Sequence, residues 1–166
     1  MLWFWAGGIG AMIAMIEYLL NTASEAEIAK HLLHCDADFI PPLSNRVDIN
    51  KYAQKIASRA MKFEAWSGST LVGLVAAYCN DQENLIAYIT SVSVLREWMG
   101  QGIAANLLKQ CITHATDSDM RQISLEVASI NQPAIRLYEK NGFVAGQTNT
   151  PFVNMNLYLK NGAEHG

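Results

Sequence analysis

The sequence predicts a mixed α/β fold with a partly antiparallel sheet. The 166 residues fall within the usual size of one domain, and 51% are hydrophobic against 16% charged, which is typical of a globular chain. Segments with strand-like and helix-like apolar patterns are mixed along the chain in the order β-α-α-β-β-β-α-β-α-β-β. Ser67-Gly68-Ser69 separates two of the expected strands and is typical of a hairpin turn.

Helix-start and helix-stop signals define the expected helices. Ser24 followed by Glu27 is a capping box, which opens an amphipathic helix through about Cys35. The last expected helix is capped by Asn131 and stopped by Gly142. The expected helices cover residues 24–35, 48–61, 102–116 and 131–141.

Short apolar runs rich in β-branched residues define the expected strands. Pro41 and Pro42 exclude regular structure from residues 36–45, which we expect to form a loop. The expected strands cover residues 16–20, 63–66, 71–79, 86–95, 122–128, 143–148 and 153–160.

The first sixteen residues are apolar and uncharged. They are shorter than the ~20 residues that a membrane span needs, and they lack the positive charge that opens a secretory signal. We expect residues 1–14 to be an extension outside a single domain at 15–166. It is either a translation-start artefact or a hydrophobic helix used in self-association, which would give a homodimer. The sequence leaves both open.

Charge and cysteine usage narrow the class of protein. A formal net charge of −3 and the absence of a Lys/Arg run argue against a nucleic-acid partner. Cys35, Cys79 and Cys111 match no metal or redox spacing, so we expect no metal. An odd, unpatterned set of thiols fits a reducing compartment, and the expected location is the cytoplasm.

A strand leads into a helix through a glycine-containing turn over residues 92–105, which reads VSVLREWMGQGIAA. Gly100 and Gly102 allow the backbone to bend so that successive N–H groups point at one spot, and the helix N-terminus adds its own free amides. This arrangement suits a pyrophosphate. The turn also satisfies a dinucleotide-binding pattern, Gly100-x-Gly102-x-x-Ala105 with Glu126 further on, but a five-residue step separates strand from glycine and hairpins precede it.

A second motif follows at residues 125–143, LEVASINQPAIRLYEKNGF. Asn131, Ala134 and Tyr138 lie on one face of its expected helix. In this order and spacing, the two motifs resemble the GNAT superfamily of N-acetyltransferases. The resemblance implies a mostly antiparallel, twisted sheet with splayed central strands, flanked by about four helices. It also implies direct transfer of the acetyl group of acetyl-CoA to a primary amine.

The resemblance also assigns residues to the cofactor. Main-chain groups of two strand valines pair with the pantetheine arm, amides of the turn bind the pyrophosphate, and Tyr138 protonates the departing thiolate. The residues expected to bind acetyl-CoA are Val92, Val94, Met99, Gly100, Gln101, Gly102, Ile103, Ala104, Ala105, Asn131, Ala134 and Tyr138.

Two positions depart from the family pattern. Met99 replaces the usual Arg or Gln at the start of the turn, which we expect to weaken binding without abolishing function. Ile86 stands where some members carry a catalytic Glu, so the group that accepts the amine's proton is not evident. Glu126 and Tyr88 are the candidates, each of which could equally be a structural strand residue.

The acceptor is the least specified part of the reaction. We expect Asp38, Phe39, Tyr78 and Asn80 to line its site, and we favour a small-molecule amine because no extended acidic groove is evident. Acetylation of a protein N-terminus or lysine stays open, as does O-acyl transfer. The alternative of another class is a non-catalytic, acyl-CoA-binding regulatory module that kept the glycine turn and lost its base.

Overall fold

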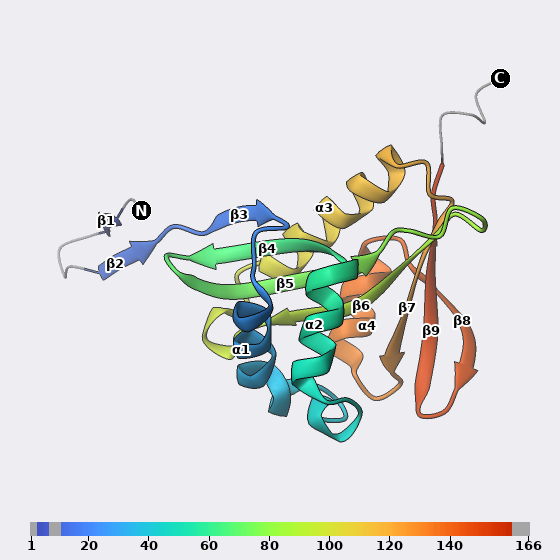
Figure 1. Cartoon of the computed structure of the whole chain (residues 1–166), viewed down its shortest axis with the longest axis horizontal. Coiled ribbons are helices and arrows are strands. Elements are labelled where there is room, and N and C mark those ends of the chain that lie inside the picture. The colour runs from blue at the N-terminus through green and yellow to red at the C-terminus, as the bar shows by residue number, and fades with distance from the viewer. Residues whose placement is uncertain (1–2, 7–10, 161–166) are drawn as a thin grey trace.

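A seven-stranded sheet forms the centre of the protein, for which a computed structural model describes residues 3–6 and 11–160 (Figure 1). Its strand order is β3-β4-β5-β6-β7-β9-β8, and every neighbouring pair is antiparallel except β6 and β7. The strands are β3 (Glu17–Leu20), β4 (Met61–Ser67), β5 (Thr70–Tyr78), β6 (Ile86–Val94), β7 (Gln122–Ala128), β8 (Val144–Asn149) and β9 (Phe152–Tyr158). The mixed, mostly antiparallel fold predicted from the sequence is confirmed.

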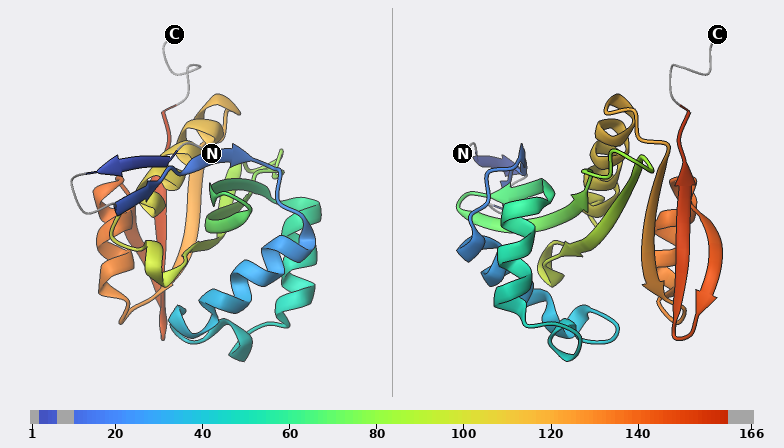
Figure 2. Two further views of the ribbon diagram at one scale, coloured as in Figure 1. Left: turned by 90° about the vertical axis from the view of Figure 1, so that its left-hand side faces the viewer. Right: turned by 45° about the vertical axis from the view of Figure 1, so that its right-hand side comes forward.

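Helices cover both faces of this sheet (Figure 2). Helices α1 (Glu25–Cys35) and α2 (Ile49–Arg59) enclose one hydrophobic core against β4 and β5. Helix α3 (Ile103–Asp117) packs on the opposite face, where Tyr138 of α4 (Gln132–Lys140) joins the second core. All four helices lie within two residues of the predicted boundaries. The predicted loop at 36–45 contains two short 3₁₀ turns, Asp36–Asp38 and Leu43–Asn45.

Two buried charged residues of β4 hold the helix pair in place. The Glu64 carboxylate accepts hydrogen bonds from the backbone N–H groups of Thr22 and Ala23, just before α1 begins. The Lys62 ammonium donates to the carbonyls of Ala57 and Ala60, at the end of α2. A negative charge thus lies at a helix N-terminus and a positive charge at a helix C-terminus, the arrangement that helix dipoles favour.

The described part of the N-terminal extension forms strands, and not the helix that was one of the two alternatives left open by the sequence. Strand β1 (Trp3–Ala6) pairs antiparallel with β2 (Ala11–Ala14), outside the main sheet. Aromatic residues favour strands, and the glycines at positions 7, 8 and 10 disfavour a continuous helix. Residues 1–2 and 7–10 of this extension lie outside the described residues. Within the described ranges, no helix combines the length and apolarity needed to cross a bilayer.

Candidate functional site

The two parallel strands at the centre of the sheet separate partway along their length. β6 and β7 are paired only at Ile86–Gln122, Ala87–Ile123 and Tyr88–Ser124. Just beyond, the register of β6 with β5 shifts, which leaves Thr90 as a bulge residue. Bulges bend a strand and increase its twist, so β6 turns away while β7 stays paired with β9 up to Ala128. The right-hand view of Figure 2 shows the two halves of the sheet diverging.

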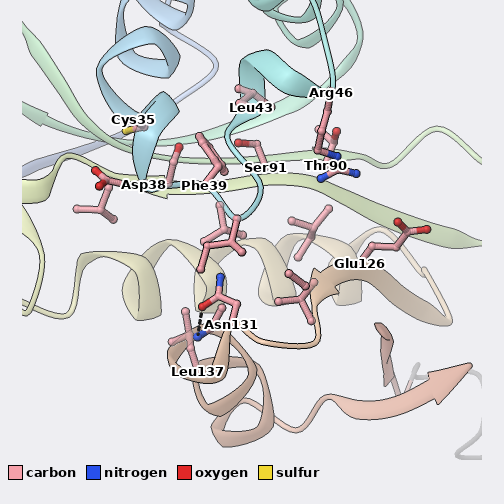
Figure 3. Close-up of a pocket in the computed structure, with 18 of the residues that line it drawn as sticks. Cys35, Asp38, Phe39, Leu43, Arg46, Thr90, Ser91, Glu126, Asn131 and Leu137 are labelled. Atoms are coloured by element: carbon pink, nitrogen blue, oxygen red, sulfur yellow. Dashed lines mark hydrogen bonds between the residues drawn. The ribbon is translucent and has the colours of Figure 1, made fainter. Parts of the chain in front are cut away.

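A cavity of about 470 Å³ occupies the space between the diverging strands (Figure 3). Its walls are residues 88–94 of β6, residues 126–128 of β7, the connection between α1 and α2, and one face of α4. Of the residues predicted to be catalytic or to bind the cofactor, those that line it are Tyr88, Val92, Val94, Met99, Glu126, Asn131, Ala134 and Tyr138.

The glycine turn adjoins this cavity and presents a row of unpaired amides. Gly100 and Gly102 have φ angles of +80° and +79°, a left-handed conformation that favours glycine. The first amide of α3 that finds a backbone partner is that of Asn106, which donates to Gly102. None of the amides of residues 100–105 donates a hydrogen bond to any described residue. Six successive N–H groups are therefore available to an anion at a helix N-terminus.

The turn residues predicted to bind the cofactor differ in which hollow they line. A smaller hollow of about 270 Å³ lies beside the turn and shares Val92, Val94 and Met99 with the main cavity. It is also lined by Gly100, Gly102, Ile103, Ala104 and Ala105. Gln101 lines neither space, so its expected contribution rests on its backbone amide.

Tyr138 lies at the inner wall of the cavity. It is 7% exposed, and burial raises the pKa of its phenol to about 12, so it stays protonated at neutral pH. Its ring packs against Phe143 at a centroid distance of 5.9 Å. Asn131 caps the helix that carries it, by accepting the N–H of Ala134 at 3.3 Å.

Glu126 and Tyr88 both line the cavity, one from each diverging strand. Glu126 is exposed and Tyr88 half-exposed. The pKa of the Tyr88 phenol is raised, mainly by desolvation and further by the charge of Glu126, and is opposed by the positive charge of Arg46. The structure thus brings the two candidate proton acceptors to the same cavity, where solvent reaches both.

Only two of the four residues predicted to line the acceptor site lie at the cavity. Asp38 and Phe39 line the cavity, whereas Tyr78 and Asn80 do not. The Asp38 carboxylate forms an ion pair with Arg96, and its side chain is only 18% exposed. A carboxylate that is already paired is a weaker partner for a cationic amine than the sequence alone suggested.

Several cavity residues were missed by sequence reasoning. Tyr52 of α2 donates from its phenol to the carbonyl of Thr90 at 2.6 Å, which fixes the bulge. Ser91 also lines the cavity, and the Arg46 guanidinium stacks over the Phe152 ring at 4.5 Å. Other lining residues outside the prediction are Cys35, Ile40, Leu43, Val47, Ile89, Ser93, Val127, Ala128, Pro133 and Leu137. Within residues 3–6 and 11–160, no three His, Cys, Asp or Glu side chains gather as a metal site.

Comparison with known proteins agrees with this geometry. Residues 27–143 match the family model described as "Acetyltransferase (GNAT) family". A Bacillus subtilis protein named "Putative ribosomal protein bS18-alanine N-acetyltransferase" is 32% identical over 78 residues, which cover 47% of this chain and 48% of that protein. Human N-alpha-acetyltransferase 30 is 30% identical over 84 residues, which cover 49% of this chain and 23% of that protein. The chain thus spans at most about half the length of these relatives.

Solved structures share the fold at low sequence identity. A Bacillus subtilis acetyltransferase in complex with CoA superposes with a TM-score of 0.68 at 15% identity, over 88% of this chain and 100% of the other. Identity this low supports the fold alone. The family model, in contrast, covers well over half of the chain and includes both motifs. The chain therefore belongs to the acetyltransferase (GNAT) family, and the enzyme class expected from its sequence, acyltransferase, is the class of that family.

Proposed function

We propose that this protein is an N-acetyltransferase that transfers the acetyl group of acetyl-CoA to the α-amine of a polypeptide. The observation that carries the proposal is the row of free amides at residues 100–105, beside a cavity opened by the divergence of β6 and β7. Unpaired amides at a helix N-terminus suit the pyrophosphate, and an unpaired strand edge suits the amide-containing pantetheine arm. The CoA bound in the Bacillus subtilis relative supports the same ligand.

Each of the three residues predicted to be catalytic then has a role in a direct transfer. The amine nitrogen bonds to the acetyl carbon while the carbon–sulfur bond breaks; the nitrogen loses one proton and the sulfur gains one. Tyr138, protonated at neutral pH, supplies the proton to sulfur and recovers it from solvent. Burial raises the pKa of the leaving CoA thiol as it raises that of the Tyr138 phenol, so the difference between the two pKa values stays similar. Glu126 and Tyr88, at the solvent-exposed part of the cavity, receive the amine's proton through water.

The nature of the acceptor follows from the charges around the cavity. Of the two carboxylates that line it, Asp38 is paired with Arg96 and Glu126 is exposed to solvent. No buried carboxylate among the described residues is therefore placed to deprotonate a strongly basic amine. An α-amine has a pKa near ~7.8 and a lysine near ~10.4, so at pH 7 the neutral fraction of the α-amine is larger by a factor of a few hundred.

The names of the relatives favour the same acceptor. One is named for the alanine of a ribosomal protein and the other for N-alpha acetylation. The small-molecule amine that we favoured from the sequence is the second candidate, supported by the size of the cavity at about 470 Å³. We also propose a cytoplasmic location, which the free thiols of Cys35, Cys79 and Cys111 support.

An acceptor panel tests the proposal. Thiol release from acetyl-CoA is followed with a lysine-free peptide bearing a free N-terminus, with the same peptide blocked at its N-terminus but carrying one lysine, and with free amino acids and polyamines. We expect the first peptide to react at least a hundredfold faster than the second at pH 7. Faster reaction of a free amino acid or polyamine would establish the small-molecule alternative. Faster reaction of the blocked peptide would refute the argument from amine basicity.

A further inference from the structure

One buried hydroxyl in the cavity wall has no hydrogen-bond partner among the described residues. Ser91 is 4% exposed, and its Oγ makes no hydrogen bond to any of the residues that the structure describes. Buried polar groups are nearly always paired, because an unpaired one loses its hydration without compensation. Since Ser91 lines the cavity, the missing partner can be supplied by a molecule that enters it.

Comparison with Ser93, two residues along β6, shows that this lack of a partner is specific to Ser91. Ser93 lies 2.9 Å from Nε2 of His31, whose Nδ1 lies 2.9 Å from the carbonyl of Leu71. A carbonyl can only accept, so Nδ1 carries the proton of the neutral imidazole and Nε2 accepts the Ser93 hydroxyl. Ser93 therefore has a hydrogen-bond partner within the part of the chain that the structure describes, and Ser91 has none there.

The position of Ser91 separates it from the cofactor side of the cavity. Ser93 lines both the cavity and the hollow beside the glycine turn, whereas Ser91 lines only the cavity. Ser91 pairs with Ala76 of β5, which belongs to the core beneath α1 and α2. In Figure 3, Ser91 lies on the side of β6 that faces Phe39 and Leu43 of the connection between α1 and α2, across from Asn131 and Leu137 on the α4 side. Strand alternation points the Val92 side chain to the opposite face.

We propose that Ser91 Oγ accepts a hydrogen bond from the amino group of the acceptor and so orients the amine for attack. This inference rests on the proposed function. A neutral amine has N–H donors and one lone pair, and fixing an N–H on Ser91 leaves the lone pair to point toward the thioester carbon beside β6. Burial raises the pKa of the Tyr52 phenol to about 12, and the nearby Ser91 hydroxyl is one of the groups that oppose this rise, although the two side chains lie outside hydrogen-bond geometry. A small rotation would let the Ser91 hydroxyl donate to Tyr52 when the amine binds.

The prediction for Ser91→Ala combines a loss of activity with no loss of stability. Because the hydroxyl has no partner among residues 3–6 and 11–160, its removal breaks no hydrogen bond there, and the melting temperature stays equal or rises. The kcat/KM for the acceptor peptide falls about 3- to 10-fold, which corresponds to one neutral hydrogen bond. The Kd for acetyl-CoA is unchanged.

Ser124→Ala is the matched control. Ser124 is also a buried strand serine, 9% exposed, but it lies outside the cavity and donates to Asn156 Oδ1 at 2.7 Å. This variant should lose melting temperature and keep the kcat/KM for the acceptor.

Three results would overturn the proposal. If the parent is active and Ser91→Ala has the same acceptor kcat/KM, the assignment of Ser91 is wrong while the proposed function stands. If Ser91→Ala destabilises the protein as much as Ser124→Ala, the hydroxyl has a partner within the protein. If the parent releases no thiol with any amine, the proposed function fails and the role of Ser91 fails with it.

Discussion

Replacing Gly102 by Asp and by Asn separates the charge of the phosphate site from its backbone geometry. A Cβ at this position would meet no atom within 4 Å, so the first side-chain atom of either substitution fits without a clash. With φ at +79°, any side chain adds strain, but Asn and Asp tolerate the left-handed region better than other residues. We expect each variant to lose about 1 kcal/mol of folding stability, which lowers Tm by roughly 2–4 °C for a chain of this size.

The two variants should differ in their response to acetyl-CoA. A carboxylate at about 5 Å from a phosphate charge, at an effective dielectric constant near ~20, repels it by about 3 kcal/mol, or about two orders of magnitude in Kd. At a hundred times the parent's Kd, acetyl-CoA stabilises the parent by about 2.7 kcal/mol, and Tm rises by roughly 5–11 °C. At that concentration Gly102→Asp would gain only about 0.4 kcal/mol, or roughly 1 °C.

Differential scanning fluorimetry with and without acetyl-CoA measures this difference directly. The Gly102→Asn variant, which has the same size and backbone strain but no charge, should keep most of the parent's Tm gain. An equal gain in the parent and in Gly102→Asp would show that the pyrophosphate does not bind at residues 100–105. If both variants lose the same part of the Tm rise caused by acetyl-CoA, then backbone geometry, and not charge, determines binding at this site.

The remaining predictions concern the proton donor, a buried imidazole and the N-terminal extension. Tyr138→Phe keeps the ring packing and removes the donor, so kcat should fall at least tenfold with the acetyl-CoA Kd within a fewfold; full activity in a folded variant would make Tyr138 a structural residue. Burial lowers the pKa of His31 to about 4, below its unfolded value near ~6.5. Between these two pH values the unfolded chain binds more protons than the folded one. The parent should therefore lose about 3 kcal/mol of unfolding free energy as the pH falls from ~6.5 to about 4. His31→Gln should lack this part of the pH dependence in urea titrations, and identical curves for the two proteins would contradict it. A chain starting at Met15 should bind acetyl-CoA as well as the whole chain, because β1 and β2 lie outside the main sheet, and loss of binding in a folded truncation would refute this.

The parts of the fold that the sequence predicted are those set by local chemistry. The capping box predicted from Ser24 and Glu27 is present, with each side chain bonded to the other's backbone N–H. Asn131 caps α4 as its spacing suggested. These signals need only residues three positions apart, so they can be read without knowing the fold.

The parts of the site that could not be predicted depend on contacts between distant residues. Tyr52 reaches Thr90 across 38 positions, Arg96 reaches Asp38 across 58, and His31 reaches Ser93 across 62. We expected Asp38 to contact the acceptor because no residue near it in the sequence indicated its ion pair with Arg96. Ser91 and Ser93 look alike in an alternating strand, and only the position of the His31 imidazole distinguishes them.

The stoichiometry of acetyl transfer tests the proposed N-acetyltransferase activity most directly. Acetyl-CoA is mixed with the protein and a lysine-free peptide, the free CoA thiol is counted, and the acetylated nitrogen is located by mass spectrometry. We expect one thiol released for each acetyl group found on the peptide's α-nitrogen, and no release with the N-terminally blocked peptide. Binding of acetyl-CoA without thiol release from any peptide or small amine would contradict it and identify a non-catalytic acyl-CoA-binding module.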